Sequence, residues 1–203
     1  MKYKLHGGGK MHDGRKVYRI KALEDFGDVR VGDLGGYIES EGNLSQKSGD
    51  TSWVYDDSIV YGRGEVLGDS KVYKNAIIQD SRIEGDSRVS HGGTVQHSRI
   101  TGDSVVQDAN VFYSRIEFSK VFADSDVKNS TVKHSEVSNG SKVYQSIIDR
   151  STVRNDAHIS GGSTIEGRTI DDESVKNNVL VAHVTLGADD LMDLEGLESE
   201  LEQ

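Results

Sequence analysis

A short unit recurs along most of the chain: a small residue, then any residue, then valine or isoleucine. It occurs about twenty times between Ser52 and Ile165, and successive units begin five or six residues apart. An α-helix, with its period of 3.6 residues, would scatter the valines and isoleucines around its axis, and a strand of period 2 would leave no gaps. The repeat therefore predicts an all-β fold, a single-stranded parallel β-helix (a solenoid) in which each valine or isoleucine stacks on its equivalent in the next coil.

Three copies of the sequence Gly-Asp-Ser set the length of a coil. They begin at Gly68, Gly85 and Gly102, 17 residues apart each time. Three steps of five or six residues then make one coil, with about seven coils between Val54 and Val175. Such a coil buries only a narrow column, so a hydrophobic content of 34% is sufficient, although globular chains usually have about 45–50%. Glycine, Asp and Asn in the gaps supply turn conformations.

The two ends differ from the repeat. Residues 16–23 alternate between apolar and polar, and with residues 1–5 they predict a hairpin that closes the first coil, because an open end would expose unpaired backbone. Residues 178–186 read as a last strand. After it, Leu191, Leu194, Leu197 and Leu201 fall on one helical face. We therefore expect an N-terminal hairpin cap over 1–40, a parallel β-helix of 16–18-residue coils over 41–186, and a short, acidic, amphipathic C-terminal helix or tail over 187–203.

The unit from Ile83 to Arg88 resembles the hexapeptide repeat of left-handed parallel β-helices, a superfamily of acyltransferases and γ-type carbonic anhydrases. The segment from Asp25 to Glu39, with residues 43–46 and 53–56, resembles the opening of acyltransferase-like proteins of bacteria and prophages that have no settled activity. The frequent five-residue steps are instead similar to pentapeptide-repeat proteins, whose coils are right-handed and four-sided. Of the two, the resemblance to the hexapeptide repeat implies left-handed, three-sided coils, which we prefer.

The net charge of −10 is unevenly distributed. Residues 1–23 carry seven Lys/Arg and one acid, a charge of +6, whereas residues 189–203 carry seven acids and no base, a charge of −7. This distribution disfavours direct nucleic-acid binding by the body of the protein. The absence of cysteine excludes disulfides and thiolate chemistry. No apolar run suits a signal peptide or a membrane span, so we expect a cytoplasmic protein without membrane contact, in the host cytoplasm if it is phage-encoded.

The histidines give little support for catalysis or metal binding. A zinc site like that of the γ-type carbonic anhydrases needs three converging histidines, and no two of the seven are 17 residues apart. Acyltransferases of the superfamily use a histidine base beside a loop that interrupts the coils, and the steps here stay at five or six residues throughout. We therefore predict no catalytic residue, no metal and no cofactor; His134 and His158 would be the candidate bases if acyl transfer occurred.

Two surfaces are candidates for a partner. Asp69, Asp86 and Asp103 should stack at one corner, with Lys71 and Arg88 two residues further on; this column is either a surface charge ladder of little energy or a partial mimic of duplex phosphates. Aromatic residues that directly follow an inward anchor should face solvent, namely Tyr55, Tyr61, Tyr73, Phe112, Phe122 and Tyr144. Phe112, Tyr113, Phe118 and Phe122 fall within about one coil and predict an aromatic patch for a protein partner or a second copy of the chain.

These observations favour a non-enzymatic, phage-type β-solenoid that docks on another macromolecule. A concrete form is an inhibitor of a host defence or nucleic-acid enzyme, such as a CRISPR nuclease, with a protein as its partner. The phage association follows from the resemblance alone. The alternatives are an acyl-CoA-dependent hexapeptide-repeat acyltransferase and an oligomeric structural scaffold, since hexapeptide β-helices commonly form trimers along their long sides.

Overall fold

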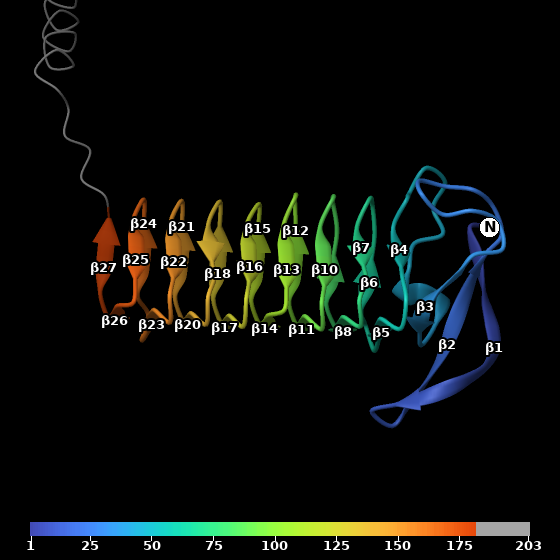
Figure 1. Ribbon diagram of the computed structural model, residues 1–203, viewed down its shortest axis with the longest axis horizontal. Coiled ribbons are helices and arrows are strands. Elements are labelled where there is room, and N and C mark those ends of the chain that lie inside the picture. Colours follow the sequence, from blue (N-terminus) through green and yellow to red (C-terminus); the bar gives the residue numbers. More distant parts are fainter. Residues whose placement is uncertain (182–203) are drawn as a thin grey trace, which may run out of the picture.

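The inward valines and isoleucines stack into three columns that run the length of a rod. A computed structural model describes residues 1–181. Residues 53–181 form eight coils of three short strands each, stacked in parallel along the long axis (Figure 1). At about 4.8 Å per coil, the eight coils span roughly 34 Å. The predicted parallel β-helix is confirmed, with three sheets and therefore three sides.

We name the three sides by the order in which the chain visits them. Face 1 consists of β4 (Trp53–Val54), β7 (Lys71–Val72), β10 (Arg88–Ser90), β13 (Val105–Gln107), β16 (Lys120–Phe122), β19 (Glu136–Val137), β22 (Thr152–Arg154) and β25 (Thr169–Asp171). Face 2 consists of β5 (Ile59–Tyr61), β8 (Ile77–Gln79), β11 (Thr94–Gln96), β14 (Asn110–Phe112), β17 (Asp126–Lys128), β20 (Lys142–Tyr144), β23 (His158–Ser160) and β26 (Ser174–Lys176). Face 3 consists of β6 (Glu65–Val66), β9 (Arg82–Ile83), β12 (Arg99–Thr101), β15 (Arg115–Glu117), β18 (Thr131–Lys133), β21 (Ile147–Asp149), β24 (Thr164–Glu166) and β27 (Val179–Val181).

The register of the coils follows the core residues. Val89 pairs with Val72 on one side and Val106 on the other, and the side chains of all three are fully buried. Each coil contributes one such residue from each face, and these residues form one continuous hydrophobic cluster. The predicted inward column of Val72, Val89 and Val106 is therefore confirmed.

The corners explain why some steps have five residues and others six. A residue with positive φ begins each corner, and in all but the last three corners a small buried residue follows either directly or after one extra residue; the exposed Arg168, Glu173 and Asn178 take that position in the last three. In the six-residue step after Ile83, Gly85 has φ +81° and Asp86 is the extra residue before Ser87. In the five-residue step after Ile116, Phe118 has φ +47° and Ser119 follows at once. Glycine, Asp and Asn occupy many of these positions as predicted, but larger side chains occupy others.

Buried serines at the corners form hydrogen-bonded ladders between coils. The Ser114 hydroxyl donates to the Phe112 carbonyl at 2.7 Å and accepts from the backbone N–H of Ser130, one coil away, at 3.1 Å. The same arrangement links Ser81 to Ser98 and Ser98 to Ser114. These hydroxyls satisfy backbone N–H groups that the corner leaves without a strand partner.

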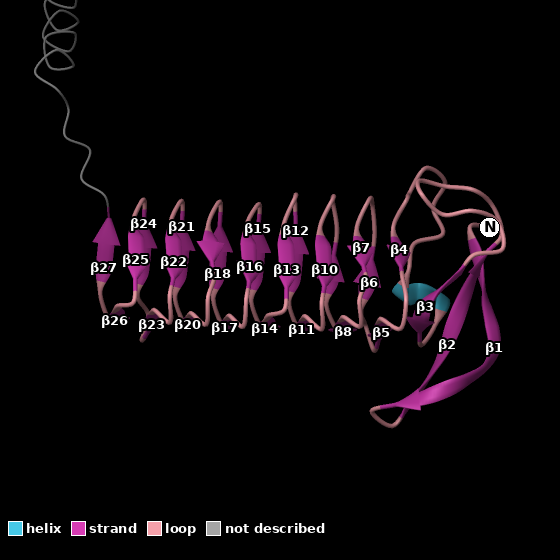
Figure 2. Cartoon of the chain, in the orientation of Figure 1, coloured by secondary structure: helices cyan, strands magenta, loops and turns pink. Residues whose placement is uncertain are grey.

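The N-terminal segment forms the predicted hairpin and extends the sheet of face 2. Antiparallel strands β1 (Tyr3–His12) and β2 (Arg15–Ala22) lead to β3 (Leu34–Ile38), which pairs with β2 on one edge and in parallel with β5 on the other. The solenoid sheet thus begins inside the segment predicted as the cap. Apart from the short 3₁₀ turn η1 (Glu41–Asn43), the described residues are strands and loops (Figure 2).

The N-terminal hairpin covers part of the first coil. Tyr61 was expected to face solvent, but it is 2% exposed because it packs with Val17 of the hairpin, and its ring lies 5.2 Å from that of His12. That prediction is wrong because the hairpin lies over the first coil of face 2. The predicted helix or tail over 187–203 lies outside the described residues.

A buried ion pair ties the first residues to the loop before β4. The Lys2 ammonium donates to the Asp50 carboxylate at 3.1 Å and to the Ser52 carbonyl at 2.9 Å, and the two charged side chains are 3% and 8% exposed. Burial lowers the pKa of Lys2, and the charge of Asp50 opposes this shift. Burial by itself would raise the pKa of Asp50, but hydrogen bonds from Ser52, Ser45 and the Gly68 N–H outweigh burial and hold that pKa below its usual range.

The serine ladder can be tested with two alanine variants. Ser114→Ala leaves the buried N–H of Ser130 without its acceptor, so the free energy of unfolding should fall by about 1–3 kcal/mol. Ser141→Ala is the matched control, because the buried Ser141 hydroxyl has no hydrogen-bond partner and alanine occupies the equivalent corner position at Ala109 and Ala157. Urea unfolding should place the control within about 0.5 kcal/mol of the parent. Equal losses in both variants would contradict the ladder.

The Lys2–Asp50 pair should make the free energy of unfolding depend on pH in the acidic range. The folded-state pKa of Asp50 is below its unfolded value near 3.8, so its stabilisation is present above that pH and is lost as the pH falls through the folded-state pKa. Asp50→Asn should flatten this part of the pH dependence and cost about 3–5 kcal/mol at neutral pH, because Lys2 remains buried without its counter-charge. Thermal melting between pH 2 and 7 checks both effects. Asp86→Asn, in an exposed pair, should cost less than about 1 kcal/mol.

Candidate functional site

Exposed apolar side chains on the coils are concentrated on one side. Within residues 53–181, the large hydrophobic residues that remain exposed are Tyr113, Phe118, Ile147, Val179 and Val181. The last three lie on face 3, and the first two lie at the ends of its strand β15. Faces 1 and 2 of these coils carry no exposed residue of this kind. Exposed apolar and aromatic side chains that gather in one place mark interaction surfaces more often than scattered ones do.

Face 3 also carries a row of arginines. The row consists of Arg82, Arg99 and Arg115, which occupy matching register positions on the neighbouring strands β9, β12 and β15. Each directly precedes an inward isoleucine. The three side chains are exposed. Because the coils are stacked in register, the guanidinium groups repeat at about the 4.8 Å spacing of neighbouring strands.

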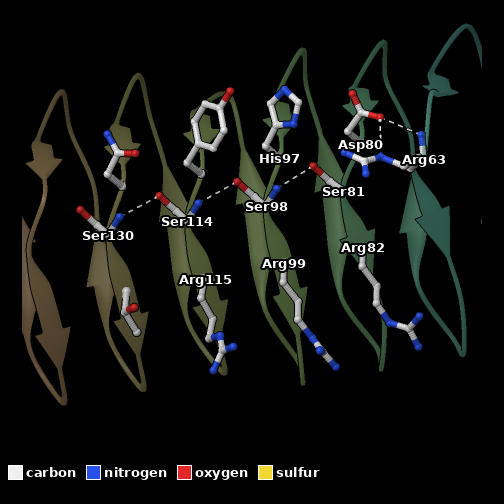
Figure 3. Close-up of a pocket in the computed structure, with 13 residues that line it drawn as sticks. Arg63, Asp80, Ser81, Arg82, His97, Ser98, Arg99, Ser114, Arg115 and Ser130 are labelled. Atoms are coloured by element: carbon white, nitrogen blue, oxygen red, sulfur yellow. Dashed lines mark hydrogen bonds and ion pairs between the residues drawn. The ribbon is translucent and has the colours of Figure 1, made fainter.

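The arginine row borders an open groove of about 550 Å³ that follows the corner between faces 2 and 3. Figure 3 shows the serine ladder along its floor, with Arg82, Arg99 and Arg115 on one side and Arg63, Asp80 and His97 on the other. Four arginines line the groove, the fourth being Arg63, against the one carboxylate of Asp80. The serine hydroxyls of the floor already donate to backbone carbonyls, so the groups that can meet a ligand are the remaining guanidinium N–H donors and the side chains of His97, Tyr113, Asn129 and Thr131.

The cations of this strip share their counter-charges. Glu84 accepts from both Arg82 and Arg99, and Glu117 is paired with both Arg115 and Lys133. Burial tends to raise the pKa of Glu84, but hydrogen bonds from the two arginines outweigh it and lower that pKa. With Glu65, which pairs with Arg82, three carboxylates face the four cations Arg82, Arg99, Arg115 and Lys133. From β6 to β18 this side of the rod therefore has a net charge of +1 in a chain of −10, whereas β21 and β24 add the acids Asp149 and Glu166.

Rings at both corners of face 3 are held in fixed positions by stacking. Tyr113 stacks on His97 with ring centroids 4.7 Å apart, and Phe118 stacks on His134 at 5.5 Å. The Phe118 ring also covers Gly102, where a Cβ would lie 2.6 Å from the ring. Tyr113 and Phe118 are nevertheless 63% and 57% exposed. Rigid rings with exposed faces can bind a partner with little loss of side-chain entropy.

The predicted aromatic patch is divided among the sides of the rod. Phe112 lies on face 2, Tyr113 at the corner between faces 2 and 3, Phe118 at the corner between faces 3 and 1, and Phe122 on face 1. The four residues surround one coil and do not form a single patch, because five- and six-residue steps carry the chain from side to side. Tyr113 and Phe118 border the arginine row, whereas Phe112 and Phe122 point away from face 3.

The predicted acidic column is present at the corner between faces 3 and 1. The Asp69 N–H donates to the Gly85 carbonyl and the Asp86 N–H to the Gly102 carbonyl, which stacks Asp69, Asp86 and Asp103 in successive coils. The column is partly neutralised, because Asp86 pairs with Arg88 at 2.9 Å and Asp69 accepts from the Thr51 hydroxyl. It ends where Phe118 takes the place of the next glycine. The column therefore borders the first coils of face 3.

Sequence reasoning missed the arginine row, although a signal for it was present. The tripeptide Ser-Arg-Ile begins at Ser81, Ser98 and Ser114, which are one coil apart. The stacking of His97 on Tyr113 had no comparable signal, because histidine and tyrosine are unusual at positions with positive φ. In the part of the chain that the structure describes, no three His, Asp or Glu side chains come close enough to share a metal ion.

Together the geometry defines a β-solenoid with one face specialised by arginines and exposed rings. No family model matches the chain, and no curated protein matches it. Among residues 1–181, no helix has the length and apolar character needed to cross a membrane.

Tyr113 can be replaced without damage to the coil, which makes it a useful probe. Its φ of +48° strains a tyrosine by about 1–2 kcal/mol, and loss of the stack on His97 costs about 0.5–1.5 kcal/mol. Asn129 occupies the equivalent corner position of the next coil with φ +50°. Tyr113→Asn should therefore leave the urea midpoint nearly unchanged. Tyr113→Val is the contrast, because a β-branched residue tolerates positive φ poorly, and it should lower the midpoint.

Proposed function

We propose that this protein is a non-enzymatic binding protein that docks through face 3 on a protein partner bearing acidic side chains. The observation that carries the proposal is the coincidence on one side of the three-arginine row and every exposed large hydrophobic residue of the coils in 53–181. Arginine and aromatic residues are the side chains most enriched in protein interfaces. Their repetition along a straight rod suits an extended partner surface more than a small molecule.

Electrostatics support an acidic partner. Each guanidinium has five donors, and the shared carboxylates Glu84 and Glu117 leave donors of Arg99 and Arg115 free for further carboxylates. A narrower form of the proposal is an inhibitor of a host defence or nucleic-acid enzyme. The acidic column of Asp69, Asp86 and Asp103 lends it only partial support, because Asp86 already has a partner in Arg88.

The test compares two charge-reversed proteins as baits in host lysate. Arg99→Glu/Arg115→Glu should lose captured partners by about tenfold or more, because two positive contacts become repulsive. Lys142→Glu/Lys176→Glu makes the same change in net charge at exposed lysines of face 2 and should capture as the parent does. The first variant should stay folded, because glutamate occurs at the same register position in Glu65.

Other outcomes would contradict the proposal. Equal capture by both variants would show that face 3 is not the docking surface. Acyl-CoA-dependent labelling of an acceptor, or tight binding of acyl-CoA by the free protein, would favour the acyltransferase instead.

A further inference from the structure

Face 3 changes character along the rod. In the row that directly precedes the inward residue, the coils of β9, β12 and β15 carry arginine, whereas the coils of β18, β21, β24 and β27 carry Thr131, Ile147, Thr164 and Val179. This second half of the row has no charge. Ile147 and Val179 are among its exposed residues, and Val181 adds an exposed aliphatic side chain at its end.

Read from the C-terminal end of the rod back towards β9, this row is first uncharged and then made of arginines, and the sequence after Val181 is likewise first uncharged and then charged. Residues 182–188 read Ala-His-Val-Thr-Leu-Gly-Ala and have no Asp, Glu, Lys or Arg. Residues 189–203 then carry seven acids and no base. The uncharged segment thus follows the uncharged half of this row, although the same strands carry Lys133, Asp149 and Glu166 two residues further on, and the acidic segment comes next.

The lengths agree. Val181 ends β27, a strand of face 3 itself, and β15 with Arg115 is four coils away, about 19 Å at the spacing of neighbouring strands. Asp189 lies eight residues after Val181, and eight residues span at most about 26–29 Å. The acidic segment can therefore begin at Arg115, and its remaining residues are long enough to pass Arg99 and Arg82.

From this match of charge, apolar character and reach, we propose that residues 182–203 bind face 3 of the same molecule. Residues 182–188 cover the row from Val179 to Ile147, and the acids of 189–203 take the free guanidinium donors of Arg115, Arg99 and Arg82. The inference concerns the surface assigned under the proposed function but does not require that a partner exist. If both hold, an acidic partner has to displace this segment in order to dock.

The absence of cysteine in the sequence permits a direct distance measurement in the full-length protein. Spin labels are placed at Leu194→Cys and at Thr131→Cys, beside Arg115 on face 3. Electron–electron distance measurement should give a defined population within about four coils, roughly 20 Å. Thr152→Cys, which occupies the same register position on face 1, replaces Thr131→Cys as the positional control and should give longer distances.

Charge variants then identify the contact. Arg99→Glu/Arg115→Glu, and separately about 1 M salt, should abolish the short-distance population, because both remove the attraction of the acids to the arginine row. Lys142→Glu/Lys176→Glu should leave it unchanged. Circular dichroism verifies that each variant is folded.

Three results would overturn the inference: no short-distance population, a population that the arginine reversal does not alter, or a population that disappears when labelled protein is diluted with unlabelled protein, which would place the contact between copies. This readout detects only the C-terminal segment and the bait experiment detects only a partner, so the failure of one is distinguishable from the failure of the other.

Discussion

Each coil is held on the next by the stacking of three inward side chains, and the surface of the protein depends on this stacking. Because Ile83, Ile100 and Ile116 must lie over one another, the residues beside them are also brought into rows. A shift by one residue would turn the inward set outward, so the register is strongly specified. A repeated tripeptide thereby becomes a repeated surface feature. The arginine row is a direct consequence of the isoleucine column.

The corners allow this regular core to carry an irregular exterior. Five- and six-residue steps both return the next valine or isoleucine to the interior, since the extra residue is accommodated after the position with positive φ. Glycine suits that position without strain, yet His97, Tyr113 and Phe118 occupy it here. In successive coils equivalent corner positions lie directly above one another, so Tyr113 stacks on His97 at one edge of face 3 and Phe118 stacks on His134 at the other, and both Tyr113 and Phe118 remain exposed. Backbone positions with positive φ that carry large side chains therefore lie along the edges of face 3.

Face 3 carries both positive charge and exposed apolar side chains. Its first half has guanidinium groups with shared counter-ions, and its second half has exposed aliphatic side chains; an acidic partner and the acidic C-terminal segment would therefore compete for one surface. Competition of this kind would make docking depend on the relative affinity of the two for the same arginines. The buried Lys2–Asp50 pair lies at the N-terminal end of the rod and contributes to the fold there; Asp50 lines the same groove as Arg82, the first member of the arginine row.

The sequence by itself determined the parallel solenoid, the inward column of Val72, Val89 and Val106, the stacked Asp69, Asp86 and Asp103, and the N-terminal hairpin. These features depend on the number of residues between successive repeats, which can be read directly from the sequence. The tertiary structure alone decided that Tyr113 and Phe118 flank one face while Phe112 and Phe122 lie on the other two, since the side of the rod that a residue occupies depends on how three unequal steps close a coil. It also decided the burial of Tyr61 beneath the hairpin and the pairing of Lys2 with Asp50. Those contacts join residues 44 to 49 positions apart, and no local pattern records which distant segments meet.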